Sequence, residues 1–147
     1  MKTFFLAIAL AIGATLATAE ETAVTYTVDQ DYDDVIFGLE SAITDEGLLI
    51  DAVNHVGAML ERTKEDVGGT QTVFLKAEVF SFCSATLSRK VMEADPMNLQ
   101  FCPYGIFVMQ TPENPEQTTI GYRIMPEGPM KEVEALLEKI VQGAIEM

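Results

Sequence analysis

The spacing of hydrophobic residues changes several times along this chain, and these changes constrain the fold more than any other feature. Val24, Tyr26 and Val28 alternate with threonines, a pattern typical of a half-buried strand. From Val35 to Ile43 the apolar residues fall at helical spacing, and Gly47 is placed to end that helix. The chain therefore begins its folded part with a strand followed by an amphipathic helix.

The spacing of hydrophobic residues also predicts the elements of the rest of the chain. It predicts strands at residues 48–53, 73–82, 104–109 and 118–125, and helices at 56–68, 84–94 and 130–145. Pro112, Asn114 and Pro115 mark a turn, so the last two strands are expected to form a hairpin. The order β-α-β-α-β-α-β-β-α predicts an α+β fold, with a mainly antiparallel sheet and helices packed on one face.

The first nineteen residues, Met1–Ala19, have the three parts of a secretory signal peptide. Lys2 supplies the positive start, an apolar run follows, and Ala17 and Ala19 place small residues at the cleavage site. The run is too short to span a membrane comfortably. We therefore expect residues 1–19 to be removed and residues 20–147 to form a single α+β domain, periplasmic or secreted, with no membrane attachment after cleavage.

The charge of the chain limits its partners. It carries 23 acidic and 9 basic residues, for a formal net charge of −14, and only Lys2 of the charged residues lies in the leader. Such a charge argues against binding to nucleic acid or to anionic lipid. Solubility in an exposed compartment explains it adequately, and a surface for cations or basic partners is the alternative.

Cys83 and Cys102 are the only cysteines, with eighteen residues between them. One ends a predicted strand and the other precedes the next strand, so both are expected at the same end of the sheet. In an oxidising compartment an even number of cysteines favours a disulfide. Two free thiols remain the alternative, because a helix is predicted to begin after Cys83 and its N-terminus would favour a reactive or metal-binding thiolate.

His55 is the only histidine. A packed or surface histidine is the simplest interpretation. The chemical alternatives are a hydrolase with Cys83 as its nucleophile, or a copper or haem site that combines His55 with the two cysteines and with methionines. No spacing in the sequence links His55 to either cysteine.

The segment from Phe82 onward resembles a known family. It combines Phe82-Cys83-Ser84-Ala85, a helix with Leu87, Ser88 and Arg89, the stop Ala94-Asp95-Pro96, and the run Phe101-Cys102-Pro103-Tyr104-Gly105-Ile106-Phe107-Val108. This ordered two-cysteine pattern resembles the domain-of-unknown-function family numbered 302, over roughly residues 26–126. The resemblance implies an α+β fold and a capacity to form homodimers. It supplies no activity, but it directs attention to the two cysteines.

The chain departs from the pattern of many members, which read Cys-Asn-Pro at the first cysteine and Pro-Cys at the second. Here Ser84 and Ala85 follow Cys83, and Pro103 follows Cys102, which indicates an exported subgroup. The candidate ligand contacts are Ser84, Arg89, Pro103, Tyr104 and His55. Our hypothesis is a non-enzymatic domain that binds a small ligand or a partner protein at a two-cysteine site. The alternative is a periplasmic thiol-redox or metal- or haem-binding protein that uses Cys83, Cys102 and His55.

Overall fold

The computed structural model describes residues 21–146. The predicted leader, residues 1–19, lies outside the described residues. The elements follow one another as β1 (Ala23–Val28), α1 (Tyr32–Asp45), β2 (Ile50–Asn54), α2 (Val56–Thr63), β3 (Lys76–Phe82), α3 (Ala85–Ala94), the 3₁₀ helix η1 (Pro96–Phe101), β4 (Tyr104–Gln110), β5 (Thr118–Arg123) and α4 (Lys131–Ile145). No helix within the described residues is long and apolar enough to cross a membrane.

The five strands form one sheet in the order β1-β5-β4-β3-β2, and every neighbouring pair is antiparallel. Strands β4 and β5 form the predicted hairpin. The α+β class, the antiparallel sheet and the order of elements are thus confirmed. Since β1 and β2 occupy the two edges, the three strands that follow α2 in the chain fill the centre of the sheet.

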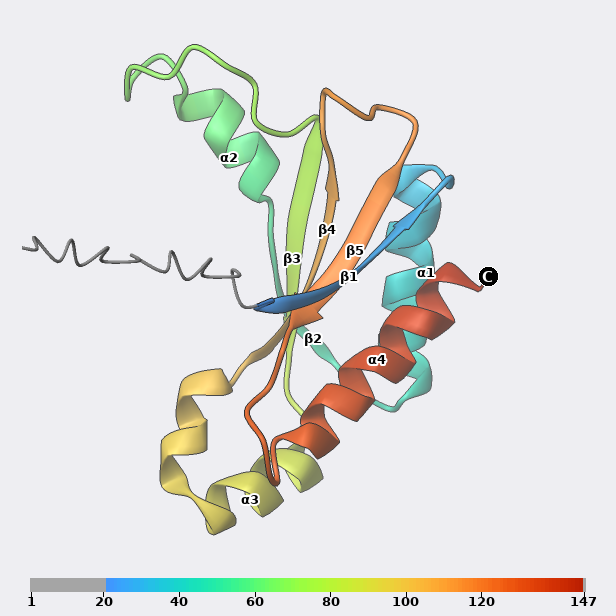
Figure 1. Ribbon diagram of the computed structural model, residues 1–147, viewed down its shortest axis with the longest axis vertical. Coiled ribbons are helices and arrows are strands. Elements are labelled where there is room, and N and C mark those ends of the chain that lie inside the picture. Colours follow the sequence, from blue (N-terminus) through green and yellow to red (C-terminus); the bar gives the residue numbers. More distant parts are fainter. Residues whose placement is uncertain (1–20, 147) are drawn as a thin grey trace, which may run out of the picture.

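Helices α1 and α4 cover one face of the sheet and pack against each other (Figure 1). Their apolar stripes meet the alternate residues of the strands that point to the same side. The side chains almost fully removed from solvent there are Val35, Leu39, Ile43, Val133, Leu137, Ile140, Phe80, Phe82, Ile106, Val108 and Ile120. This layer is the hydrophobic core, and the other face of the sheet is left largely open.

The shorter helices take other positions, which the sequence did not indicate. Helix α2 lies beside β3, beyond the point where β2 ends, and α3 with η1 sits at the opposite end of the sheet (Figure 1). Only Gly57 of α2 and only Val91 of α3 are buried. Neither helix carries the wide apolar stripe that would hold it on the core face.

Several boundaries also differ from the expected ones. Helix α2 ends at Thr63 rather than at residue 68. Strand β3 begins at Lys76 rather than at residue 73, and Val73 and Leu75 are 54% and 47% exposed. The alternation of apolar residues therefore continues into a loop that makes no strand pairing before Lys76. The segment after Asp95 forms η1, because the Asp95 carboxylate accepts a hydrogen bond from the Met97 amide and Pro96 fits the first helical turn.

Candidate functional site

The sheet brings the two cysteines together. Cys83 directly follows β3 and Cys102 lies two residues before β4, and the antiparallel register places Phe82 opposite Tyr104. The two Sγ atoms are 2.7 Å apart. This distance exceeds the about 2.05 Å of a disulfide bond, and both residues are free cysteines in the structure. The two side chains nevertheless face each other closely, as expected for residues at the same end of the sheet.

The surroundings of Cys83 differ from the expected thiolate site. Ser84 is the N-cap of α3, and its Oγ accepts a hydrogen bond from the Leu87 amide at 3.3 Å. Burial is the main reason why the pKa of the Cys83 thiol is raised to about 12. The hydrogen bond and the charge of Cys102, and then the charge of Asp51, act in the same direction. A backbone hydrogen bond at Tyr104 acts in the opposite direction without reversing the result. These surroundings therefore favour the protonated thiol of Cys83 and oppose the effect of the helix N-terminus.

The other predicted contacts from this segment have structural partners. Tyr104 is buried, and its hydroxyl lies 2.9 Å from Ser88 Oγ on α3. Arg89 is exposed on α3 and forms an ion pair with Glu93 at 2.7 Å. Pro103 is exposed and follows a cis peptide bond from Cys102. Of these, only Pro103 lines the hollow described below.

His55 lies at the other end of β3. Asn54 pairs with Val79, and His55 Nδ1 is 2.5 Å from Glu78 Oε1. Cys83 lies five positions after Glu78 in the chain, a span of about 16 Å in an extended strand. The structure therefore does not bring His55 to the cysteines, which removes the geometric basis of a Cys-His nucleophilic pair. Within residues 21–146, no group of three or more His, Cys, Asp or Glu side chains is placed to hold a metal ion.

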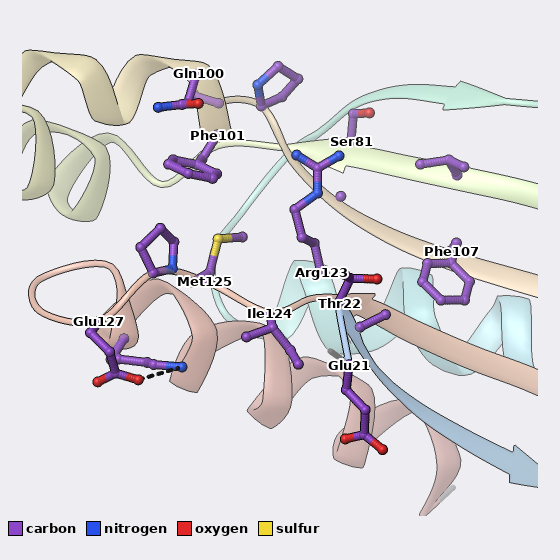
Figure 2. Close-up of a pocket in the computed structure, with 17 residues that line it drawn as sticks. Glu21, Thr22, Ser81, Gln100, Phe101, Phe107, Arg123, Ile124, Met125 and Glu127 are labelled. Carbon is purple, nitrogen blue, oxygen red and sulfur yellow. Dashed lines mark ion pairs between the residues drawn. The ribbon is translucent and has the colours of Figure 1, made fainter. Parts of the chain in front are cut away.

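A hollow of about 1040 Å³ lies on the open face of the sheet, and Cys102 and Pro103 form part of its wall. Figure 2 shows the lining side chains as sticks. The lining residues are Glu21, Thr22, Ala23, Val79, Ser81, Gln100, Phe101, Cys102, Pro103, Gly105, Phe107, Arg123, Ile124, Met125, Pro126, Glu127 and Lys131. The hollow is thus built from the sheet, the end of η1, the β5–α4 connection and the segment before β1.

The strand register explains the floor of the hollow. Ser81 pairs with Gly105, and Arg123 pairs with Ala23 on the far side. Because Ile106 pairs with Tyr122, Gly105 and Arg123 are neighbours in the next row of the hairpin. Side chains of one row point to the same face, and these four are on the face opposite to buried Phe82 and Tyr104. Gly105 therefore leaves an open space between Arg123 and Ser81.

Arg123 uses that space. Its side chain extends from β5 toward Ser81, with Phe101 and Met125 to one side and Phe107 to the other in the close-up view (Figure 2). Arg123 forms no ion pair with any described residue. Lys131, at the rim, is instead held by Glu134 at 3.0 Å and by Glu127 at 3.4 Å. The hollow therefore combines aromatic and aliphatic walls with one uncommitted guanidinium group.

The sequence reasoning missed most of these residues. Arg123 lies in no motif of the sequence, and Phe101 and Phe107 belong only to the family-like motif. The available signal was strand alternation, because Ser81, Phe107 and Arg123 each alternate with the large buried side chains of their strands. That parity shows which face a residue occupies, but only the sheet order brings three strands together.

Comparison with known proteins supports the overall architecture. The family model described as "Domain of unknown function DUF302" matches residues 24–143. The fold is similar to the crystal structure of an uncharacterized conserved DUF302 protein from Bacillus stearothermophilus, with a TM-score of 0.57 and 18% sequence identity. That similarity covers 86% of this chain and 90% of the other. Among curated proteins, none matches this sequence.

Proposed function

This chain belongs to the DUF302 family, and from that premise we propose that it is an exported, non-enzymatic domain that binds a small ligand in the hollow on its open sheet face. The single observation that carries the proposal is the position of Cys102, which lines the hollow while its sulfur lies 2.7 Å from that of Cys83. The two-cysteine site thus flanks a concave, largely apolar surface of the kind that small molecules occupy.

The export part of the proposal rests on the leader-like residues 1–19. In an oxidising compartment the two thiols would lose two protons and two electrons to a disulfide oxidant and become a bridge. Closing a loop of about twenty residues would stabilise the fold by about 3 kcal/mol in the chain-entropy model. The bridge would also hold the end of η1 against β3, and so fix one wall of the hollow.

A thiol-redox protein is the second candidate, because the close approach of the two sulfurs is the geometry that reversible disulfide formation requires. The high pKa of Cys83 weighs against rapid exchange, since the thiolate is the attacking species. A copper or haem protein that uses His55 together with both cysteines has less support, because His55 lies at the other end of β3.

Ligand binding is tested with the uncharged fluorescent probe N-phenyl-1-naphthylamine. We expect the mature protein to bind this probe, and the variant Gly105→Leu to bind it at least tenfold more weakly. A Cβ atom at Gly105 would meet only ordinary contacts, the nearest being Val79 Cγ1 at 3.6 Å, so the longer side chain enters the hollow without disturbing the sheet. The control is Thr27→Leu, an exposed position on the same face outside the hollow. Equal probe binding by all three proteins would refute the proposed pocket.

The state of the cysteines is tested separately. The mature protein, isolated from its compartment, is alkylated with and without reductant and then weighed by mass spectrometry. We expect no alkylation without reductant and two alkylated cysteines after reduction. Two reactive thiols without reductant would contradict the bridge, and a Soret band or stoichiometric copper in the same sample would favour the rival metal-binding function. The expected homodimer stays a prediction.

A further inference from the structure

Unpaired basic groups are rare in this acidic chain. With 23 acidic and 9 basic residues, a cation readily finds a carboxylate partner. Lys64, Lys76, Arg89, Lys90, Lys131 and Lys139 each form an ion pair. Among residues 21–146, only Arg62 and Arg123 do not. Arg62 is exposed on α2, outside the hollow, so Arg123 is the uncommitted cation that lines a concave surface.

The position of Arg123 favours a ligand rather than a carboxylate of the protein. Glu21 and Glu127 also line the hollow, but Figure 2 shows both carboxylates directed away from the guanidinium group. Ser81, toward which Arg123 extends, offers a hydroxyl group without charge. A guanidinium and a hydroxyl group on the same floor are two hydrogen-bond donors for one bound anion.

The walls around this polar pair are apolar. Phe101 comes from η1, Phe107 from the floor on β4, and Ile124 and Met125 from the chain after β5. Met125 is buried, but Phe101, Phe107 and Ile124 are only partly buried, and a small hydrophilic anion would leave these three side chains in contact with water. An anion with a hydrocarbon body would cover them while its charged end meets Arg123.

We propose that the hollow binds a singly charged amphipathic carboxylate, with its carboxylate group on Arg123 and Ser81 and its hydrocarbon part against Phe101 and Phe107. This inference rests on the proposed ligand-binding function and specifies its ligand. The single charge follows from the electrostatic balance, because one guanidinium group neutralises one negative charge and the rest of the chain repels a second. The planar fork of arginine also matches the two oxygens of a carboxylate.

The test compares octanoate, 1-octanol and octyl phosphate by isothermal titration calorimetry at pH 8 on the folded mature protein. Each of the three ligands contains one linear chain of eight carbon atoms, and the three carry one, no and two negative charges respectively. We expect octanoate to bind about tenfold more tightly than 1-octanol. This factor corresponds to the lower end of the free energies that hydrogen bonds to charged groups contribute. Octyl phosphate should bind more weakly than octanoate.

Arg123→Gln is expected to abolish the preference for octanoate over 1-octanol while binding of N-phenyl-1-naphthylamine stays unchanged. Arg62→Gln is the matched control, since it removes the same charge outside the hollow and should change neither ligand's affinity. Loss of the preference in both variants would show a general charge effect and overturn the assignment to Arg123.

The outcomes separate this inference from the proposed function. Probe binding that Gly105→Leu weakens, together with equal affinities for octanoate and 1-octanol, would overturn the carboxylate assignment and leave the ligand pocket standing. Tighter binding of octyl phosphate than of octanoate would overturn the single-charge assignment. If neither the neutral probe nor octanoate binds, both proposals fail.

Discussion

At the scale of single residues, Glu138 on α4 joins the helix layer to two strands. Its carboxylate accepts hydrogen bonds from the Tyr122 hydroxyl at 2.6 Å, the Tyr26 hydroxyl at 2.7 Å and the Gln142 amide at 2.9 Å. Burial alone would raise the pKa of Glu138, but the three hydrogen bonds outweigh it and lower the pKa below its ordinary value of 4.5. The ionised form of Glu138 therefore stabilises the folded state.

We predict that Glu138→Gln lowers the free energy of unfolding at pH 7 by about 1–2 kcal/mol, because one tyrosine hydroxyl then faces an amide donor instead of an acceptor. A carboxyl group with a lowered folded-state pKa stabilises above its unfolded pKa, and this contribution disappears as pH falls through the folded value. The difference between the two proteins should therefore shrink below about pH 4.5. Urea denaturation across pH 3–7 measures it.

The control for this prediction is Glu146→Gln, which removes the same charge from the exposed end of α4. It should leave the free energy of unfolding within about 0.5 kcal/mol of the original value. A constant difference between Glu138→Gln and the parent protein over the whole pH range would contradict the role given to the ionised carboxylate.

Cys83 shows at the same scale how position and environment can disagree. The sequence correctly places it just before a helix, where the macrodipole favours a thiolate. Its burial and the adjacent Cys102 instead raise the pKa of the thiol to about 12. The local sequence shows the helix start, but it contains no information about the desolvation that a neighbouring strand imposes.

At the scale of elements, the contact between α1 and α4 depends on a glycine. A Cβ atom on Gly38 would lie only 2.3 Å from the carbonyl oxygen of Ala144, so the two helices approach closely at this point. Gly143 lies in the same pair of helices, but a Cβ atom there would be 3.4 Å from Ala42 Cβ, an ordinary contact. The two glycines therefore have different roles despite their similar surroundings.

We predict that Gly38→Ala destabilises the protein by about 1–3 kcal/mol, because the helices must move apart to admit one methyl group. Gly143→Ala is the matched substitution. It should be neutral or stabilising by up to about 1 kcal/mol, since alanine is the better helix former and space exists. Thermal and urea denaturation of both variants measure the difference. Equal effects of the two substitutions would refute the close packing of α1 and α4 at Gly38.

The elements also differ in how well the sequence predicted them. Strands β1, β4 and β5 and helices α1 and α4 follow clear periodicity and were placed to within a few residues. Strand β3 was extended too far, because Val73 and Leu75 continue the alternation although the paired residues of β3 begin only at Lys76. The turn of η1 was missed, since it has no periodic apolar pattern and none of its residues is buried.

At the scale of the whole molecule, the net charge of −14 acts against compaction. Seven ion pairs of lysine and arginine among the described residues oppose this repulsion, but most of their side chains are well exposed. Exposed pairs contribute about 0–1 kcal/mol each and are weakened by salt. We expect the repulsion between the many unpaired carboxylates to dominate the response of stability to ionic strength.

We therefore predict that raising NaCl from 0.02 M to 0.3 M increases the melting temperature by about 3 °C or more, measured by circular dichroism. The double variant Glu113→Lys, Glu116→Lys changes two exposed residues in the β4–β5 turn and makes the net charge less negative by four. It should melt at a higher temperature in low salt and respond less to NaCl. A melting temperature that falls with salt would mean that the ion pairs outweigh the repulsion.

The α+β class, the order of the elements, the hairpin and the placement of both cysteines at one end of the sheet could all be predicted from the amino-acid sequence. These features follow from local periodicity and turn residues, which act within a few positions along the chain. The tertiary structure decided the strand order, the row from Ser81 through Gly105 to Arg123, and the separation of His55 from the cysteines. Such features depend on which distant strands become neighbours and on the burial that follows, and no local pattern encodes either one.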